Sequence, residues 1–502
     1  MNRRAGGVFI LGLLPAALGA QVGYRLRFET QLQTVTFRGL TADSLPVSDT
    51  VTGPGGGPAT PDGYAVTCFP EGAYCHFFRA GPALHGTPVV SAADLSLWGL
   101  GIPGLSARVS ARASGDLSDA RIWPGTTPRF QLLEGYLEYA RSWVTARAGR
   151  QLVTSRLGYE GFDGGRVLVR TARLGLEADG YVGWGLTNGV ALPVTSPAVN
   201  PLGDFQPAER QIVAGVGAGW SSRWGDVRAD YLREVDPSVD YFVSERAAVQ
   251  AVVRPPLPGF TLQAGSDWDL AMGLWGSAEA SATYTRSRLS ATAGARRYRP
   301  FFPLWTVWGA FSPVPYHATF GRGGVHATDW LDVRASGEKY AYEAAEIATG
   351  LVETGSDGWR WALDGTAAMA HGFTLGLGYA AEFGPGASAA GWNGSVSYAP
   401  PSDPRLLVTI EGATLQRPLE YRFDESRLKS LGVNVQADVA SSVRLALGGI
   451  YYTEDRRRPD AQALNWNQFR ATASVTLLLG SGADDQSLPP AIRRMPSGSG
   501  SP

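Results

Sequence analysis

Two cysteines, Cys68 and Cys75, have the chemistry that is easiest to predict from spacing. Both lie in one segment rich in glycine and proline, and in an oxidising compartment we expect them to close a local loop with a disulfide. The spacing is neither C-x-x-C nor C-x-x-C-H, so it predicts neither a thioredoxin-type redox site nor an attached c-type haem. His76 is the one further ligand type nearby, which disfavours a metal site.

Other residues that could perform catalysis do not form a recognisable constellation. The histidines, His76, His85, His317, His326 and His371, are scattered along the chain. The sequence contains no G-x-S-x-G, no H-E-x-x-H and no P-loop motif. We therefore expect no enzyme activity, no cofactor and no metal centre.

Charged residues are few and balanced. They make up 18% of the 502 residues, and the formal net charge is -1 at pH 7. The basic residues, of which only Lys339 and Lys429 are lysines, form no cluster, which argues against a nucleic-acid partner. After the first twenty residues, no apolar run approaches the ~20 residues of a membrane-spanning helix. The hydrophobic content of 44% must therefore be distributed in another way.

Alternation with period two is the dominant pattern, and it is typical of β-strands with one apolar face. Residues 105–114 show it clearly, because Leu105, Ala107 and Val109 fall on one face, opposite Ser106, Arg108 and Ser110. Comparable segments elsewhere predict about 22 strands, with 18 or 20 as the lower alternatives.

The predicted connections alternate between short and long. Residues 141–142, 285–287 and 440–442 are short turns, whereas 115–128, 153–165 and 186–210 are expected to be long loops. This sorting predicts an all-β chain that forms a single transmembrane antiparallel up-and-down β-barrel. Its short turns would be periplasmic and its long loops extracellular. Outward aromatic residues are predicted to form two belts, as expected at the two membrane interfaces.

The composition changes along the chain and divides it into three predicted segments. Residues 1–20 combine two arginines, an apolar stretch and Leu18-Gly19-Ala20, and they predict a cleaved signal peptide. Residues 21–479 form the predicted barrel, which places the protein in the bacterial outer membrane. Residues 480–502 are rich in serine, glycine and proline and predict a disordered periplasmic tail.

The polar face of the predicted strands should line the lumen. Its charges nearly cancel, and two interpretations remain open: a channel with a mixed arginine–carboxylate constriction, or cross-strand ion pairs that satisfy a polar wall. The lumen-lining candidates are Arg25, Arg27, Glu29, Arg108, Arg112, Glu134, Glu138, Arg147, Asp230, Arg246, Glu279, Arg296, Arg334, Arg360, Asp364, Arg444 and Arg470.

Two segments are candidates for narrowing the pore. The first is 41–86, which contains both cysteines. The second runs from Phe301 to Tyr316 and is too aromatic for a freely solvated loop. For this second segment we consider four placements: in the lumen, on the rim, against a partner, or as a distorted strand facing lipid.

The chain resembles a bacterial outer-membrane porin. Arg147-x-Gly149-Arg150-Gln151, followed by Gly161-Phe162-Asp163-Gly164-x-Arg166, is similar to a strand–loop–strand segment of alginate-export-type porins. In that family, arginines that line a narrow lumen guide an anionic polysaccharide, and the resemblance implies such a role for Arg147 and Arg166. Because the lumen charges are balanced, we take the resemblance to imply the porin architecture and not the anionic polysaccharide substrate.

We therefore predict a porin-like channel for the passive passage of small polar solutes. Two alternatives are kept: a plug-less scaffold barrel that sheathes a partner such as a multihaem cytochrome, forming an electron conduit, or a polysaccharide export porin. Strand-like alternation begins at Val22 and leaves no room for a plug domain before the barrel. Expected partners are outer-membrane lipids, the barrel-assembly machinery and a periplasmic or lumen-inserted protein; nucleic acid is not expected.

Overall fold

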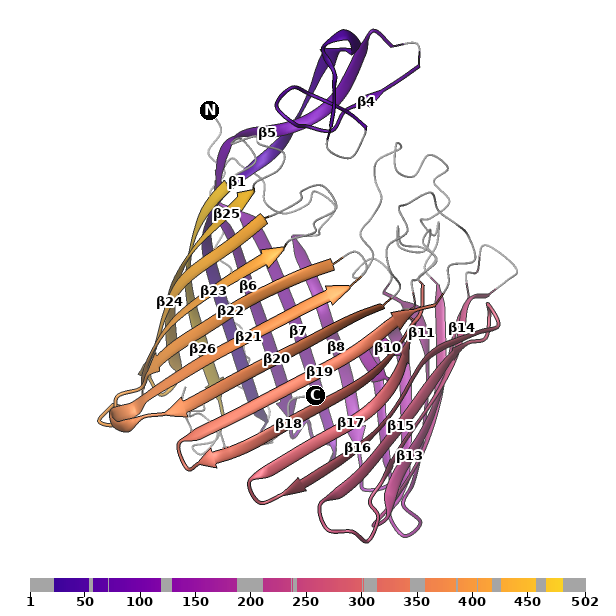
Figure 1. Cartoon of the computed structure of the whole chain (residues 1–502). Helices are drawn as coiled ribbons and strands as arrows, with labels where there is room; N and C mark the ends of the chain where they lie inside the picture. Colours follow the sequence, from indigo (N-terminus) through magenta and orange to yellow (C-terminus); the bar gives the residue numbers. More distant parts are fainter. Residues whose placement is uncertain are drawn as a thin grey trace, which may run out of the picture.

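A closed antiparallel wall of 22 strands forms the body of the molecule (Figure 1). The computed structural model describes residues 22–53, 57–70, 72–118, 129–186, 211–235, 237, 242–299, 301, 314–343, 357–384, 387–403, 405–417, 426–456 and 466–481. The predicted signal peptide lies outside these residues, as does the predicted tail beyond Ser481. Within the described part of the chain, no helix is long and apolar enough to span a membrane.

Each wall strand pairs with the next wall strand along the chain, as in an up-and-down barrel. The wall strands are β1 (Gly23–Pro46), β6 (Pro88–Trp98), β7 (Leu105–Asp116), β8 (Phe130–Ala140), β9 (Val144–Ser155), β10 (Gly158–Thr171), β11 (Leu176–Gly185), β12 (Ile212–Ser222), β13 (Gly225–Val235), β14 (Phe242–Val253), β15 (Phe260–Asp269), β16 (Leu274–Arg286), β17 (Leu289–Tyr298), β18 (Tyr316–Thr328), β19 (Leu331–Tyr342), β20 (Asp357–Ala368), β21 (Phe373–Gly384), β22 (Ala387–Tyr398), β23 (Leu406–Arg417), β24 (Ser426–Ala440), β25 (Val443–Arg456) and β26 (Trp466–Gly480).

The first and last strands close the barrel. β1 pairs with β26 from Arg25↔Gly480 to Val35↔Arg470, and on its other side it pairs with β6. Closure removes the sheet edges, whose free N–H and C=O groups have no partner in lipid. The predicted fold class and the predicted strand number of about 22 are therefore confirmed.

Aromatic rings on the outward face form two belts. Near the short turns, Phe260 packs on Tyr284 and Phe373 packs on Tyr398, with ring centroids 5.0 and 4.5 Å apart. Toward the opposite rim, Tyr379 packs on Trp392 at 4.5 Å. Between the belts, the outward face carries exposed valines and leucines such as Val109, Val216 and Leu377. A closed barrel with this exterior belongs in the bacterial outer membrane, as predicted.

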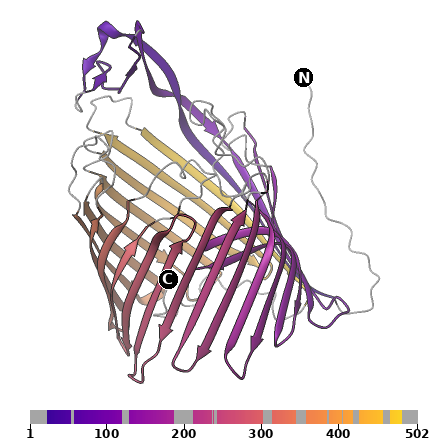
Figure 2. The same cartoon turned by 90° about the vertical axis from the view of Figure 1, so that its right-hand side faces the viewer.

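The predicted loop 41–86 does not enter the barrel. Above Val35, β1 leaves the wall and pairs with β5 (Tyr74–Gly86), and the pairing continues to Pro46↔Tyr74. The two strands form a free-standing ribbon that rises beyond the rim (Figures 1 and 2). The alternation that predicts a strand extends only to about residue 38, because glycine and proline interrupt it beyond that point. The interpretation of 41–86 as a pore-narrowing loop is therefore wrong.

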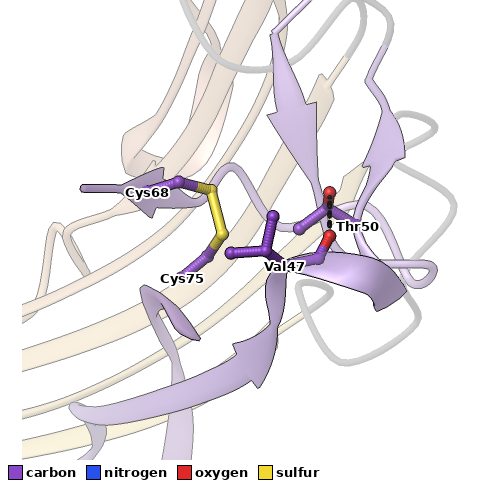
Figure 3. Close-up of a disulfide and its surroundings, with 4 residues drawn as sticks. All are labelled: Val47, Thr50, Cys68 and Cys75. Carbon is purple, nitrogen blue, oxygen red and sulfur yellow. Dashed lines mark hydrogen bonds between the residues drawn. A yellow bond between two sulfur atoms is a disulfide. The ribbon is translucent and has the colours of Figure 1, made fainter. Parts of the chain in front are cut away.

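A small folded head caps this ribbon. It contains the 3-10 helix η1 (Val47–Asp49), the short sheet of β2 (Val51–Thr52) and β3 (Pro58–Ala59), and β4 (Thr67–Cys68), which pairs with the start of β5. Cys68 and Cys75 are register partners in this pair and are joined by a disulfide (Figure 3). The Val47 amide donates a hydrogen bond to the Ala73 carbonyl at 3.1 Å, which ties the ribbon end to the head.

The expected long loop 153–165 is also wrong. β9 and β10 continue through this stretch and meet at a tight turn with Ser155↔Gly158 in register. Gly161, Gly164 and Gly165 weaken the apolar alternation that would have identified β10, because glycine contributes no side chain to either face.

The assignment of faces can be tested at neighbouring positions of β7. Val109→Arg should lower the free energy of unfolding by about 2–4 kcal/mol, because the charge would face lipid near the midplane. Ser110→Arg should be tolerated, because its register neighbours Asp94 and Glu134 can pair with the new guanidinium. Urea titration of the barrel in lipid vesicles measures both, and equal costs would contradict the assignment.

The disulfide should stabilise the head and leave the barrel unaffected. In a chain-entropy model, a loop this short contributes about 2.5 kcal/mol. Replacing Cys68 and Cys75 together with serine should speed proteolysis within residues 47–73. Electrophoretic mobility of the unheated and heated barrel reports on the wall and should not change. A loss of barrel stability in this variant would contradict the separation of the two parts.

Candidate functional site

Contacts between distant strands show which face points into the barrel. The Arg246 side chain on β14 reaches residues of the β9–β10 hairpin, although three strands lie between β10 and β14 in the wall. Such a contact can be made only across the inside of a closed cylinder. Residues that are paired in register share a face of the sheet, so the strand pairing identifies the inward residues of every strand around the wall.

The tip of the β9–β10 hairpin bends into the lumen. Arg246 Nη1 donates to the Leu157 carbonyl at 2.7 Å, and Nη2 donates to Glu160 Oε1 at 2.8 Å. Arg156, at the turn itself, lies 3.8 Å from the Asp267 carboxylate on β15. These contacts anchor the tip against strands four to five positions away along the wall, so the hairpin narrows the interior.

Apolar packing holds the tip in place. Leu157 is buried against Val213, Leu232 and Ala248, which come from the inner faces of β12, β13 and β14. Tyr181 on β11 packs against the same cluster. Burying a leucine side chain contributes about 1.5–3 kcal/mol, so the hairpin is held by hydrophobic contact as well as by the ion pairs.

Glycines of β12 make room for a charged cluster beneath the hairpin. The inner face of this strand carries Gly215, Gly217 and Gly219. A Cβ atom at Gly217 would lie 2.5 Å from Arg228 Nη2 and 2.6 Å from Asp179 Oδ1. The side chains of the neighbouring strands therefore lie flat across β12, which a larger residue would prevent.

Arg228 is the centre of that cluster. It pairs with Glu177 at 3.0 Å, with Asp179 at 2.7 Å and with Asp230 at 2.8 Å. Arg166 reaches the second oxygen of Asp179 at 3.0 Å. Asp179 is almost completely buried, and its charge is compensated by two guanidinium groups.

A second ion-paired group lies on β17, β19 and β20. Glu338 accepts hydrogen bonds from Arg296 at 2.6 Å and from Arg360 at 2.6 Å. Three strands are thereby joined through one carboxylate, and the lumen charges are compensated on this side as well.

The predicted lumen candidates all fall in the inward register, and several of them meet. Arg27 pairs with Glu29 at 2.7 Å, Arg108 with Glu134 at 3.2 Å, and Arg147 with Glu138. Arg112 donates to Gln131. Other candidates are joined to residues outside the list or lie beside inward neighbours: Asp230 to Arg228, Arg246 to Glu160, Arg296 and Arg360 to Glu338, Arg444 to Asp438, Glu279 beside Arg296, Arg334 beside Asp364, Arg25 opposite Gly480, and Arg470 opposite Val35.

Sequence reasoning missed the residues that anchor the hairpin. Arg156 and Glu160 fell in the expected loop 153–165 and were not considered as lumen residues. The sequence contains no clear signal there, because the inward face includes the apolar Phe162 and the outward face includes the charged Asp163.

Phe301 begins the aromatic segment whose placement was open. Its ring packs against the Arg246 guanidinium, with 4.0 Å between the guanidinium carbon and the ring centroid. The segment therefore starts inside the barrel, beside the hairpin tip. Residues 302–313 lie outside the described part of the chain. Among the described residues, no group of three or more His, Cys, Asp or Glu could hold a metal ion.

Arg246 should hold the hairpin tip inside the lumen. Arg246→Ala removes both anchoring hydrogen bonds and leaves Glu160 unpaired, which for a buried pair costs about 3–5 kcal/mol. We expect a folded barrel with larger and noisier single-channel conductance, measured in planar bilayers. Arg334→Ala, on the inner face of β19, is the matched control and should leave the noise unchanged. Identical traces from the two variants would contradict an anchoring role.

No protein-family model matches the chain, and no curated protein matches its sequence. Solved structures with a similar backbone include Acinetobacter baumannii OccAB2, with a TM-score of 0.41 and 11% identity over 91% of this chain and 98% of that chain. Pseudomonas aeruginosa OprD has a TM-score of 0.39 and 9% identity, covering 93% and 98% of the two chains. The outer membrane protein opdK from Pseudomonas aeruginosa has a TM-score of 0.37 and 12% identity, covering 91% and 99%. The barrel is defined by the pairing of this chain's own strands.

Proposed function

We propose that this chain is an outer-membrane channel through which small polar solutes pass by diffusion. The observation that carries the proposal is the inward β9–β10 hairpin, anchored by Arg246 to Leu157 and Glu160. A wall of 22 strands encloses a wide interior, and an ordered segment that narrows it gives the channel a defined constriction. The polar, ion-paired inner face supplies hydrogen-bonding groups for water and polar solutes.

The charge pattern supports weak ion selectivity. Arginine and carboxylate groups alternate around the inner face and are paired in each cluster, as at Arg228 and at Glu338. A channel that strongly selects one sign of ion needs an excess of the other sign along its path. The two sequence interpretations, a mixed constriction and a satisfied polar wall, are compatible in this geometry.

The same features weigh against the alternatives. A sheath for a threaded partner requires an open interior, and the hairpin tip occupies part of that space. In an export channel for an anionic polysaccharide, arginines should be available to the polymer. Arg147 and Arg166, which the resemblance singled out, are paired with Glu138 and Asp179. Small solutes of low charge suit such a wall better.

Conductance measurements test the proposal directly. The purified barrel, inserted into a planar bilayer, should give discrete ion-conducting steps with weak selectivity. A barrel that inserts and never conducts would overturn the proposal. Purification from native membranes should yield the barrel without a stoichiometric partner, and a tightly bound partner protein would favour the scaffold alternative.

Removing one sign of charge should shift ion selectivity in a defined direction. The double variant Glu134→Gln, Glu138→Gln leaves Arg108 and Arg147 unpaired and should shift the reversal potential in a salt gradient toward anions. Arg108→Gln, Arg147→Gln removes the opposite partners of the same pairs and should shift it toward cations. Shifts of the same sign, or no shift in either variant, would contradict a path along this part of the wall.

A further inference from the structure

Four tyrosines gather on the inner face at the rim opposite the short turns. Tyr298 ends β17, Tyr316 begins β18, and Tyr340 and Tyr342 lie at the end of β19. Tyr298, Tyr316 and Tyr342 lie in one register row. We call these four residues the tyrosine cluster. The inner face of a channel barrel is ordinarily polar, so the cluster calls for an explanation beyond wall packing.

The rings of the cluster are packed into a fixed array. Tyr316 lies 5.5 Å from Tyr298, 5.8 Å from Tyr340 and 5.6 Å from Tyr342, measured between ring centroids. Tyr340 and Tyr342 meet edge to face at 5.9 Å. These separations are within the range in which aromatic pairs attract each other.

Tyr340 forms the base of the array. It is buried, and its hydroxyl donates to Glu382 at 3.1 Å. Cβ atoms at Gly358 and Gly384 would each lie 2.2 Å from atoms of this tyrosine, so the two glycines allow its ring to lie flat against the wall.

The outer members of the cluster remain exposed. Tyr298 is 44% exposed and Tyr342 is 37% exposed. Their rings belong to an ordered array and yet present surface toward the interior of the barrel. A preformed aromatic surface of this kind can contact a ligand with little loss of side-chain freedom on binding.

Polar groups adjoin the rings. Arg360 donates to the Tyr316 hydroxyl at 3.4 Å and to Glu338, which also accepts from Arg296. Next to them, a cavity of about 650 Å³ is lined by Arg296, Phe320, Glu338, Arg360, Glu382 and Asn393, among others. This volume is in the range of small-molecule sites, which combine apolar surface with a few placed polar groups.

We propose that the tyrosine cluster and this cavity form a binding site for neutral oligosaccharides, a proposal that rests on the channel function above. The apolar C–H faces of sugar rings can stack on Tyr298 and Tyr342, and the hydroxyl groups can hydrogen-bond with Arg360 and Glu382, which adjoin the cluster. Arg296 and Arg360 both pair with Glu338, and Glu382 is the register partner of Arg360, so this part of the wall carries two guanidinium groups and two carboxylates. The balanced charge favours a neutral ligand with many hydroxyl groups over an ion.

Calorimetric titration of the full-length barrel in detergent with maltotriose tests the site independently of conduction. The wild type should bind, and Tyr298→Ser, Tyr342→Ser should lose roughly tenfold in affinity, as expected for two aromatic contacts. Tyr298→Phe, Tyr342→Phe keeps the rings and should retain most of the affinity. Tyr136→Ser, on the inner face of β8, is the control and should bind as the wild type does.

In planar bilayers, maltotriose should interrupt the ion current through the wild type and through Tyr136→Ser. The same concentration should cause fewer interruptions in the Tyr298→Ser, Tyr342→Ser variant. Absence of maltotriose binding by the wild type, or equal affinity in the double serine variant, would overturn the sugar site. A barrel that binds the sugar through these tyrosines and conducts no ions would overturn the channel function and leave the site standing.

Discussion

The requirement that every backbone amide in lipid has a partner governs this molecule. A sheet with an open edge would expose a row of N–H and C=O groups to hydrocarbon, at several kcal/mol for each unsatisfied group. The chain meets the requirement by pairing β1 with β26. Once the wall is closed, the pleat alone decides which side chains face lipid and which face the interior. The aromatic belts, the ion-paired inner face and the inward position of the hairpin anchors all follow from that closure.

Glycines on the inner face leave room for long side chains of neighbouring strands to lie flat against the barrel wall. On β12 three successive inward positions, Gly215, Gly217 and Gly219, are glycines, and the side chains of Tyr181, Asp179, Arg228 and Glu177 spread over them. The same device recurs at the rim, where Gly358 and Gly384 accept the ring of Tyr340. The high glycine content is therefore partly a property of the interior: residues without side chains determine how far neighbouring long side chains can lean along the wall and meet one another.

The sequence alone was sufficient to predict a wall strand wherever both faces of that strand carry side chains. β7 was predictable because Leu105, Ala107 and Val109 oppose Ser106, Arg108 and Ser110 in strict alternation. The first half of β10 was not, because glycines occupy positions on both faces there and the pattern resembled a loop. The inward candidates followed from parity, but the clusters did not, because pairs such as Arg246 with Glu160 join strands that are distant around the wall. Such contacts depend on curvature and on the bend of the hairpin, which a local pattern does not contain.

The ribbon above the rim has a mechanical consequence. β1 is one continuous strand from the short-turn end of the wall to the head that the disulfide closes, and its lower half forms the seam with β26. A force applied to the head is therefore carried along a single backbone into the pairing that keeps the cylinder shut. The ribbon would act as a lever that pivots at the rim of the barrel. The β1–β26 hydrogen bonds nearest to the rim, at Val35 and Arg470, would bear the force first.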